Sequence, residues 1–228
     1  NNETIIDANG EITEDLSSFA QSVDKIKDGN LVASLITAGA PTASVTDLAN
    51  ARELRIAHVP EDRQKRGLVM SFDAWESAVL GYQARQRYSA GGWLKPKVMR
   101  DDCAQMMDKY DVRPRACDLR SSKFSGGNQQ KLVLAREAAP EPRVLLVGQP
   151  TRGVDIGAIE FIHGRLRAMR DAGGTVLLVS SELDEVLALA DRVLVMDRGR
   201  IVGELPIEQC SEAELGRLMG GAGLAKAA

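Results

Sequence analysis

Residues 144–155 read VLLVGQPTRGVD. The unbroken apolar run Val144–Val147 ends abruptly in Gly148, Gln149 and Pro150. Such runs are typical of a strand buried on both faces of a parallel sheet, and α/β proteins carry their chemistry at the carboxyl ends of those strands. A phosphate or metal site would need a carboxylate at this point, whereas the chain has a glycine and an amide.

The sequence that follows alternates between strand and helix patterns. Apolar runs rich in Val and Leu recur at Thr175–Ser180 and Arg192–Met196, and residues at helical spacing fill Ile156–Ala172 and Glu182–Ala190 between the runs. This order predicts an α/β fold with parallel pairing and right-handed crossovers.

Shorter predicted elements flank this α/β half. Three helical patterns precede it, at Phe72–Tyr82, Val98–Tyr110 and Gln129–Ala138. Glycines at 199 and 203 predict a hairpin after it, and Ser211 with Glu214 predicts a capping box at the start of a last helix, Ser211–Met219. The first fifty residues predict a hairpin around Asn9-Gly10, a strand within Leu31–Ile36 and a short helix over Thr46–Arg55.

Composition bounds the class of protein. The 228 residues are 44% hydrophobic and 27% charged, which is ordinary for a globular domain, and the net charge of −3 offers no basic field for nucleic acid. Three widely spaced cysteines favour a reduced setting over a disulfide framework. We find no stretch long enough to span a membrane and no signal peptide pattern. Because the chain opens with Asn1, we expect a piece of a longer polypeptide or a processed chain.

The strongest local signal is the stretch KFSGGNQQK, residues 123–131. Ser125 and two glycines stand just before a helix predicted to start near Asn128. Glycines let backbone N–H groups approach a ligand, and a helix N-terminus favours a phosphate. The alternative reading of this stretch is a loop with an N-cap.

The order of segments adds a resemblance. Phe124–Asn128 is similar to the Leu-Ser-Gly-Gly-Gln signature of ABC transporter ATP-binding domains, and it precedes a strand at the Walker B place. Arg152–Asp155 resembles the D-loop, Val176–Glu182 the switch strand, and His58–Arg63 the Q-loop. The chain is most similar to the second, degenerate ATP-binding domain of simple-sugar importers, and within that group to the nucleoside branch. The resemblance covers roughly residues 51 to 206.

The resemblance implies a P-loop NTPase-like ABC domain with a mostly parallel sheet, a helical subdomain and a small antiparallel β part. Four segments are then expected. Residues 1–50 form a β part that lacks a Walker A loop, 51–64 the Q-loop region, 65–140 the helical subdomain with the signature, and 141–228 the α/β half with Walker B, D-loop and switch.

The family's catalytic positions are altered here. The Gly-x-x-x-x-Gly-Lys-Ser/Thr phosphate loop is missing: a candidate strand at 31–39 runs into APTAS, residues 40–44, unless the loop lies upstream of Asn1. Gly148 stands at the magnesium-binding aspartate and Gln149 at the catalytic glutamate, and an amide cannot accept a proton. Ser181 replaces the switch histidine, and Glu61 occupies the Q-loop glutamine position. We therefore expect no ATP hydrolysis by this chain alone and assign no catalytic residue, although the family that it resembles consists of ATPases.

The signature works in trans in this family. The resemblance therefore implies that Ser125, Gly126 and Gly127, with Asn128 and Gln129, cap the γ-phosphate of an ATP held with Mg by a partner's loops. We expect no metal site in this chain, and binding of ATP by the chain alone is doubtful.

Other candidates have two interpretations each. Asp155 is the D-loop acid or the cap of the following helix. Met70, Phe72 and Trp75 are permease contacts or core residues. The histidines, His58 and His163, are assigned structural roles. A basic set is read as a solvated face rather than a nucleic-acid patch: Arg85, Arg87, Lys95, Lys97 and Arg100.

Two functions follow from these patterns. The first is the ATP-binding subunit, or half-subunit, of a nucleoside or simple-sugar importer, peripheral on the cytoplasmic side of the membrane. Its partners are another ATP-binding domain, upstream or in a second subunit, and permease subunits, without nucleic acid. The alternative is a non-catalytic regulatory or interaction module on the same fold that does not bind ATP by itself.

Overall fold

The computed structural model describes residues 3–6, 12–15, 33–34, 56–197 and 200–219. The chain divides into two compact units, a central unit of Arg55–Ser181 and a terminal unit of Asn1–Leu54 with Glu182–Ala228. Within the described residues, no helix is both long and apolar enough to cross a bilayer.

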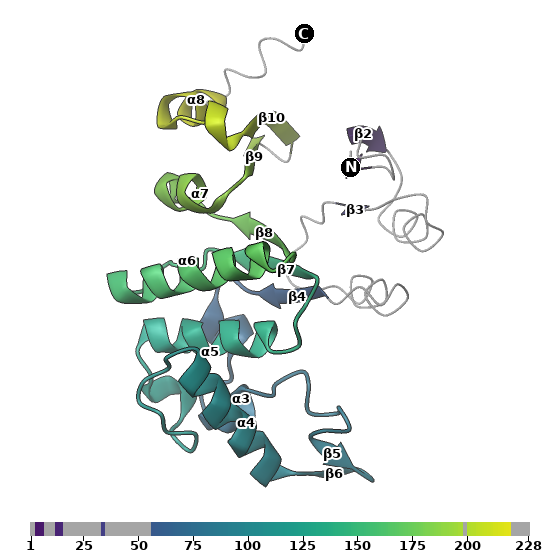
Figure 1. Ribbon diagram of the computed structural model, residues 1–228, viewed down its shortest axis with the longest axis vertical. Helices are drawn as coiled ribbons and strands as arrows, with labels where there is room; N and C mark the ends of the chain where they lie inside the picture. Colours follow the sequence, from purple (N-terminus) through teal and green to yellow (C-terminus); the bar gives the residue numbers. More distant parts are fainter. Residues whose placement is uncertain (1–2, 7–11, 16–32, 35–55, 198–199, 220–228) are drawn as a thin grey trace. The chain divides into compact units, whose positions relative to one another are not determined.

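A three-stranded parallel sheet forms the centre of the central unit, in the order β4-β7-β8 (Figure 1). β7 (Val144–Gly148) lies between β4 (Ile56–Val59) and β8 (Thr175–Val179). Its side chains at Leu145 and Val147 are almost fully buried, as the apolar run predicts. The parallel pairing of β7 with β8 is confirmed, whereas β4 was not predicted as a strand.

Two helices pack side by side next to this sheet (Figure 1). α5 (Gly126–Ala138) is buried along most of its length, and α6 (Ile156–Asp171) buries Ala158, Ile162 and Leu166. α6 also contacts β8, so this helix fixes the N-terminus of α5 relative to the sheet.

The predicted helical subdomain is less regular than expected. α4 (Pro96–Lys109) and the 3-10 turn η2 (Ser121–Lys123) are present, but the helix predicted over Phe72–Tyr82 is confirmed only in part. Only α3 (Ala74–Ser77) is helical, because the Ser77 carbonyl accepts a bond from the Arg136 guanidinium and the backbone continues in tight turns. A short π-helix, η1 (Arg63–Gly67), follows β4.

A small hairpin precedes α4. β5 (Ser89–Ala90) pairs antiparallel with β6 (Trp93–Leu94), and the turn between them uses two glycines, Gly91 and Gly92, with φ of +56° and +84°. Both glycines need the left-handed region of φ, which other residues adopt rarely.

The described part of the terminal unit near the C-terminus contains α7 (Leu183–Leu189), β9 (Arg192–Asp197), β10 (Arg200–Pro206), the 3-10 turn η3 (Ile207–Gln209) and α8 (Glu212–Arg217). β9 pairs antiparallel with β10, so the predicted hairpin is confirmed and the expectation of a third parallel strand is wrong. The hairpin return gives β9 its partner, and Val193 and Val195 pack with Leu215 and Leu218 of the same unit.

At the N-terminus, β1 (Glu3–Ile6) pairs antiparallel with β2 (Ile12–Asp15) and with β3 (Ala33–Ser34), which confirms the predicted hairpin. The Asn9-Gly10 turn, the helix predicted over Thr46–Arg55 and the APTAS segment lie outside the described residues.

Candidate functional site

The signature segment forms the start of α5. Ser125 is the N-cap residue, and the helix begins at Gly126 rather than near Asn128, so the two glycines lie in the first helical turn. The Ser125 hydroxyl oxygen accepts from the backbone N–H of Asn128 at 3.4 Å and from its side-chain amide at 2.8 Å. Ser125 itself is exposed.

The two glycines are required by close packing inside the chain. A Cβ at Gly126 would lie 2.6 Å from an Arg63 guanidinium nitrogen, and one at Gly127 would lie 2.8 Å from the Cβ of Ala158. The start of α6 can therefore lie this close to α5 only because residue 127 is glycine. At residue 126 a Cβ would require the flexible end of the Arg63 side chain to shift, and it would lie 3.0 Å from the Gly153 carbonyl oxygen.

The side chains of the last two predicted signature residues form hydrogen bonds within the chain: Gln129 is buried, and Asn128 is partly buried and lines the pocket described below. Gln129 is 2% exposed, and its side-chain amide donates to the carbonyls of Ser121 and Phe124, each at 3.1 Å. The Asn128 side-chain oxygen accepts from the backbone N–H of Arg113 at 2.6 Å. These side chains hold the signature loop in place, so Ser125 is the exposed side chain of the five.

The segments that resemble the Q-loop and the D-loop are joined by hydrogen bonds and an ion pair. The Arg63 guanidinium donates to the carbonyls of Arg152 and Gly153, and Arg152 forms an ion pair of 2.6 Å with Glu61. Asp155 caps α6, since its side-chain oxygen accepts from the N–H of Ala158 at 2.9 Å. The capping interpretation of Asp155 is therefore confirmed.

The four residues that the sequence predicts to be altered catalytic positions lie together at the carboxyl edge of the sheet. Glu61 follows β4, Gly148 and Gln149 end β7, and Ser181 follows β8. A Cβ at Gly148 would lie 3.2 Å from the Glu61 backbone nitrogen. Gln149 has φ of +46°, and its side-chain oxygen accepts from the Ser181 N–H at 3.3 Å and hydroxyl at 3.2 Å.

This edge does not fit a magnesium nucleotide. The amide of Gln149 is already bonded to Ser181, and the position of a magnesium-binding carboxylate is a glycine enclosed by the Glu61 backbone. Within the described residues, no cluster of three or more His, Cys, Asp or Glu side chains could hold a metal ion. In β4, burial lowers the pKa of His58, which favours the neutral imidazole of a structural residue.

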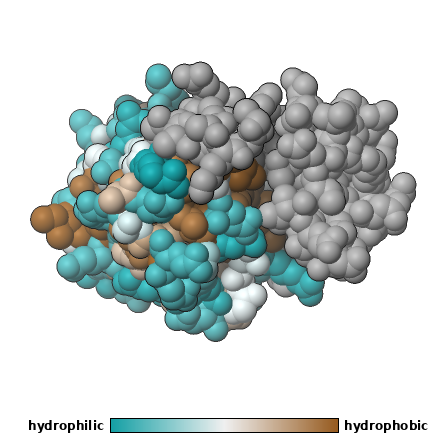
Figure 2. Space-filling view, turned by 90° about the horizontal axis from the view of Figure 1, so that it is seen from above, coloured by the Kyte–Doolittle hydropathy of each residue, from teal (hydrophilic) through white to brown (hydrophobic). Residues whose placement is uncertain are grey.

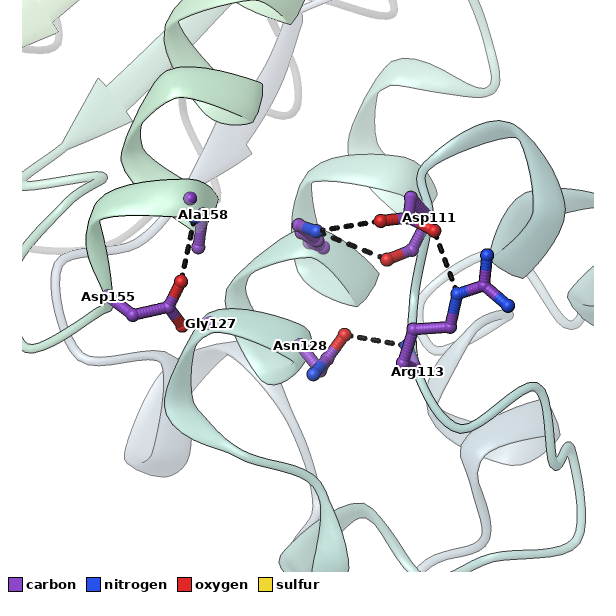
Figure 3. A pocket seen from close by; sticks show the side chains of 8 residues that line it. Asp111, Arg113, Gly127, Asn128, Asp155 and Ala158 are labelled. Carbon is purple, nitrogen blue, oxygen red and sulfur yellow. Dashed lines mark hydrogen bonds and ion pairs between the residues drawn. The ribbon is translucent and has the colours of Figure 1, made fainter.

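A small pocket opens where the N-termini of α5 and α6 approach each other (Figure 3). Its volume is about 250 Å³. Lys131 donates to the Asp111 carbonyl at 3.1 Å, and Arg113 pairs with the Asp111 carboxylate at 2.8 Å and lowers the pKa of that carboxyl. Asp155 lines the opposite side, so the fixed charges of this pocket are balanced.

The three predicted permease contacts differ in exposure. Phe72 is 39% exposed, while Met70 and Trp75 are half-buried. Trp75 packs against the buried cluster around Val79 and Met99, with the Arg100 guanidinium 4.3 Å from its ring centre. Trp75 thus contributes to core packing, and the permease contacts stay a prediction. Sequence reasoning missed Arg63, whose only signal was its place at the end of the His58–Arg63 segment that resembles the Q-loop.

Known proteins resemble this chain in sequence and in fold. It is 43% identical over 169 residues to the guanosine import ATP-binding protein NupO of Bacillus subtilis, covering 74% of this chain and 33% of NupO. The nucleoside import ATP-binding protein NupA of Lactococcus lactis is 41% identical over 180 residues, 77% of this chain and 36% of NupA. A dimeric structure of the ATP-binding cassette MJ0796 with ADP and Pi matches with a TM-score of 0.56 and 20% identity, over 71% of this chain and 67% of the cassette.

The chain belongs to the ABC ATP-binding domain family. This ABC domain spans about a third of the length of the curated relatives it matches. No family model matches it. The resemblance to ABC ATP-binding domains is confirmed, whereas the assignment to a second, degenerate domain stays a prediction. The parallel sheet with its helices has the fold of the ABC cassettes.

Proposed function

We propose that this ABC domain is part of the ATP-binding protein of a nucleoside or simple-sugar importer and supplies its signature and D-loop to a partner's ATP site. NupO and NupA are named as guanosine and nucleoside import proteins, and RbsA of Corynebacterium glutamicum, 37% identical over 89% of this chain and 37% of RbsA, as a ribose import protein. In this proposal the domain is peripheral on the cytoplasmic side of the membrane, with permease subunits as further partners.

Ser125 carries the proposal. Its hydroxyl oxygen has two lone pairs and one proton, and both acceptor positions are used by the two nitrogens of Asn128. The remaining O–H can only donate, and it lies at the exposed, electropositive end of α5. This arrangement suits an oxygen of a phosphate that another domain presents.

The domain's own catalytic edge supports the asymmetric part of the proposal. Gln149 cannot act as a general base, and Gly148 cannot hold magnesium. ATP and Mg are therefore assigned to the partner's site, and this chain supplies backbone amides and the Ser125 hydroxyl toward the γ-phosphate.

The test is ATP turnover by the intact transporter with Ser125→Arg. We expect turnover to fall about a hundredfold, the loss typical when a donor to transition-state charge is removed. Ser122→Arg is the matched control, since Ser122 is also exposed and lies three residues upstream. Unchanged turnover in Ser125→Arg would refute the trans role.

The second candidate is a regulatory or interaction module that binds no ATP by itself. It is favoured by the internal bonding of the altered positions, where Gln149 pairs with Ser181 and Glu61 with Arg152. Equilibrium dialysis of the chain with labelled ATP tests this candidate, because micromolar binding by the chain alone would exclude it.

A further inference from the structure

One segment of the central unit differs from the rest of the chain in charge. Residues 77–100 contain five basic side chains and no Asp or Glu, in a chain whose net charge is −3. This segment includes the β5–β6 hairpin and the first turn of α4. We call residues 85–97 the basic hairpin.

The tip of the basic hairpin exposes apolar side chains. Trp93 is 81% exposed and Leu94 is 52% exposed, although they are adjacent in sequence and belong to one strand. Figure 2 shows one face of the molecule, where hydrophilic surface dominates among the described residues and hydrophobic patches are small. An indole this exposed is unusual, because burying a large aromatic side chain stabilises a fold.

The base of the hairpin is firmly held. Tyr88 is 7% exposed and its carbonyl accepts from the Lys95 N–H at 2.8 Å. The Arg87 guanidinium forms a two-bond pair with Asp102, which is buried. The exposure of Trp93 therefore belongs to an anchored loop and not to a loose one.

Of the five basic side chains in residues 77–100, two form ion pairs with carboxylates that the structure describes and three do not. Arg87 pairs with Asp102, and Arg100 pairs with Asp118 at 2.8 Å. Within the described residues, Arg85, Lys95 and Lys97 form no ion pair with a carboxylate. Arg85 lies over the Tyr82 ring and Lys95 donates to the Gln86 carbonyl, so both keep their positive charge next to the apolar tip.

We propose that the basic hairpin docks on a membrane surface that contains anionic phospholipids. Tryptophan prefers the interface between headgroups and hydrocarbon, where its ring is apolar and its N–H remains hydrated. Clustered Lys and Arg side chains are attracted to anionic headgroups. Leu94 favours lipid over nucleic acid, since an aliphatic side chain gains from entering hydrocarbon but cannot stack with bases as an aromatic ring does. This inference rests on the proposed transporter role in one respect: that role is the reason for choosing a membrane, and not another polyanion, as the surface that the hairpin binds.

The first experiment uses the tryptophans as reporters. The chain contains two, so Trp75→Phe leaves Trp93 as the sole emitter and keeps an aromatic ring in the packed position. We expect Trp93 emission to shift to the blue with vesicles of mixed phosphatidylglycerol and phosphatidylcholine, and to remain unchanged with pure phosphatidylcholine. An unshifted spectrum with anionic vesicles would overturn the proposal.

The second experiment measures partitioning by vesicle sedimentation. Neutralising Arg85→Gln or Lys97→Gln should each lower the partition coefficient about fivefold, because each basic residue near an anionic surface contributes about that factor. Arg167→Gln is the control, since Arg167 is also exposed but lies on α6. An equal loss in the control would show unspecific attraction and refute a docking site at the hairpin.

A third arm tests the other polyanion. We add a single-stranded oligonucleotide to the chain bound to vesicles. If the oligonucleotide displaces the chain and binds it more tightly than the vesicles do, the lipid proposal is wrong and nucleic acid is the ligand of the hairpin. These measurements use neither ATP nor a partner domain, and Ser125→Arg does not alter the hairpin. Failure of vesicle binding therefore leaves the signature proposal standing, and failure of the Ser125 test leaves the hairpin proposal standing.

Discussion

Gly127→Ala tests the close contact between α5 and α6. The new Cβ would lie 2.8 Å from the Cβ of Ala158 and 2.9 Å from a carboxylate oxygen of Asp155. Carbon atoms prefer about 3.5–4.0 Å, so α6 must move or the Asp155 cap must open. Overpacking of this kind costs about 1–3 kcal/mol and a lost cap about 1 kcal/mol, while alanine regains about 1 kcal/mol of helix propensity. We expect a net destabilisation of about 2 kcal/mol.

The assay is urea unfolding followed by tryptophan fluorescence, because both tryptophans lie in the central unit. Gly164→Ala is the matched control: Gly164 lies within α6, and a Cβ there meets no atom within 4 Å. This control should stabilise the unit by about 0.5–1 kcal/mol. If both substitutions shift the midpoint in the same direction by similar amounts, the packing account of the signature glycines is wrong.

Three further outcomes follow from the described contacts. Arg136→Met should destabilise the central unit by about 3–5 kcal/mol in urea unfolding, because it leaves the buried Glu137 carboxylate without its ion-pair partner. Hydrogen bonding from Arg87 lowers the pKa of Asp102. The Asp102 carboxylate therefore stabilises the fold above the usual aspartate pKa, and this stabilisation is lost as the pH falls through the lowered pKa of the folded state. The difference in unfolding free energy between wild type and Asp102→Asn should accordingly shrink on acidification. Asp155→Ala should cost about 1 kcal/mol in thermal unfolding, and Asp155→Ser should restore most of it.

The sequence predicted the carboxyl edge of the parallel sheet well, because the motifs follow one another along the chain in the same order as the strands lie in the sheet. The apolar run at Val144–Val147 and its neighbour at Thr175–Ser180 became paired parallel strands, which brings Gln149 next to Ser181. The strand before Glu61 was missed, since only four residues, Ile56–Val59, pair with β7 and they were read as part of a loop motif.

The two failures have different causes: a distant side-chain contact in one case and a competing pairing with the next strand in the other. Phe72–Tyr82 has helical periodicity, but the Ser77 carbonyl bonds to the Arg136 guanidinium, 59 residues away in sequence. Arg192–Met196 has the pattern of a buried parallel strand, yet a hairpin partner and the cluster around Leu215 take its apolar face. The Arg136 contact lies outside any window of local sequence around Ser77, whereas the hairpin partner of Arg192–Met196 follows it directly in the chain.

Because the signature glycines are closely packed within the chain, Ser125 is the residue that best tests whether the signature acts on a partner's ATP. Gly126 and Gly127 are needed by contacts within the chain, so their presence alone does not indicate ATP binding. Ser125 differs, because any good N-cap would satisfy α5 whereas only a donor would serve a phosphate. Ser125→Asp should keep the cap, with thermal stability within about 0.5 kcal/mol of wild type, and place a negative charge against the γ-phosphate. Lost turnover in the intact transporter with an unchanged melting temperature is the expected result, and full turnover would show that Ser125 serves the helix alone.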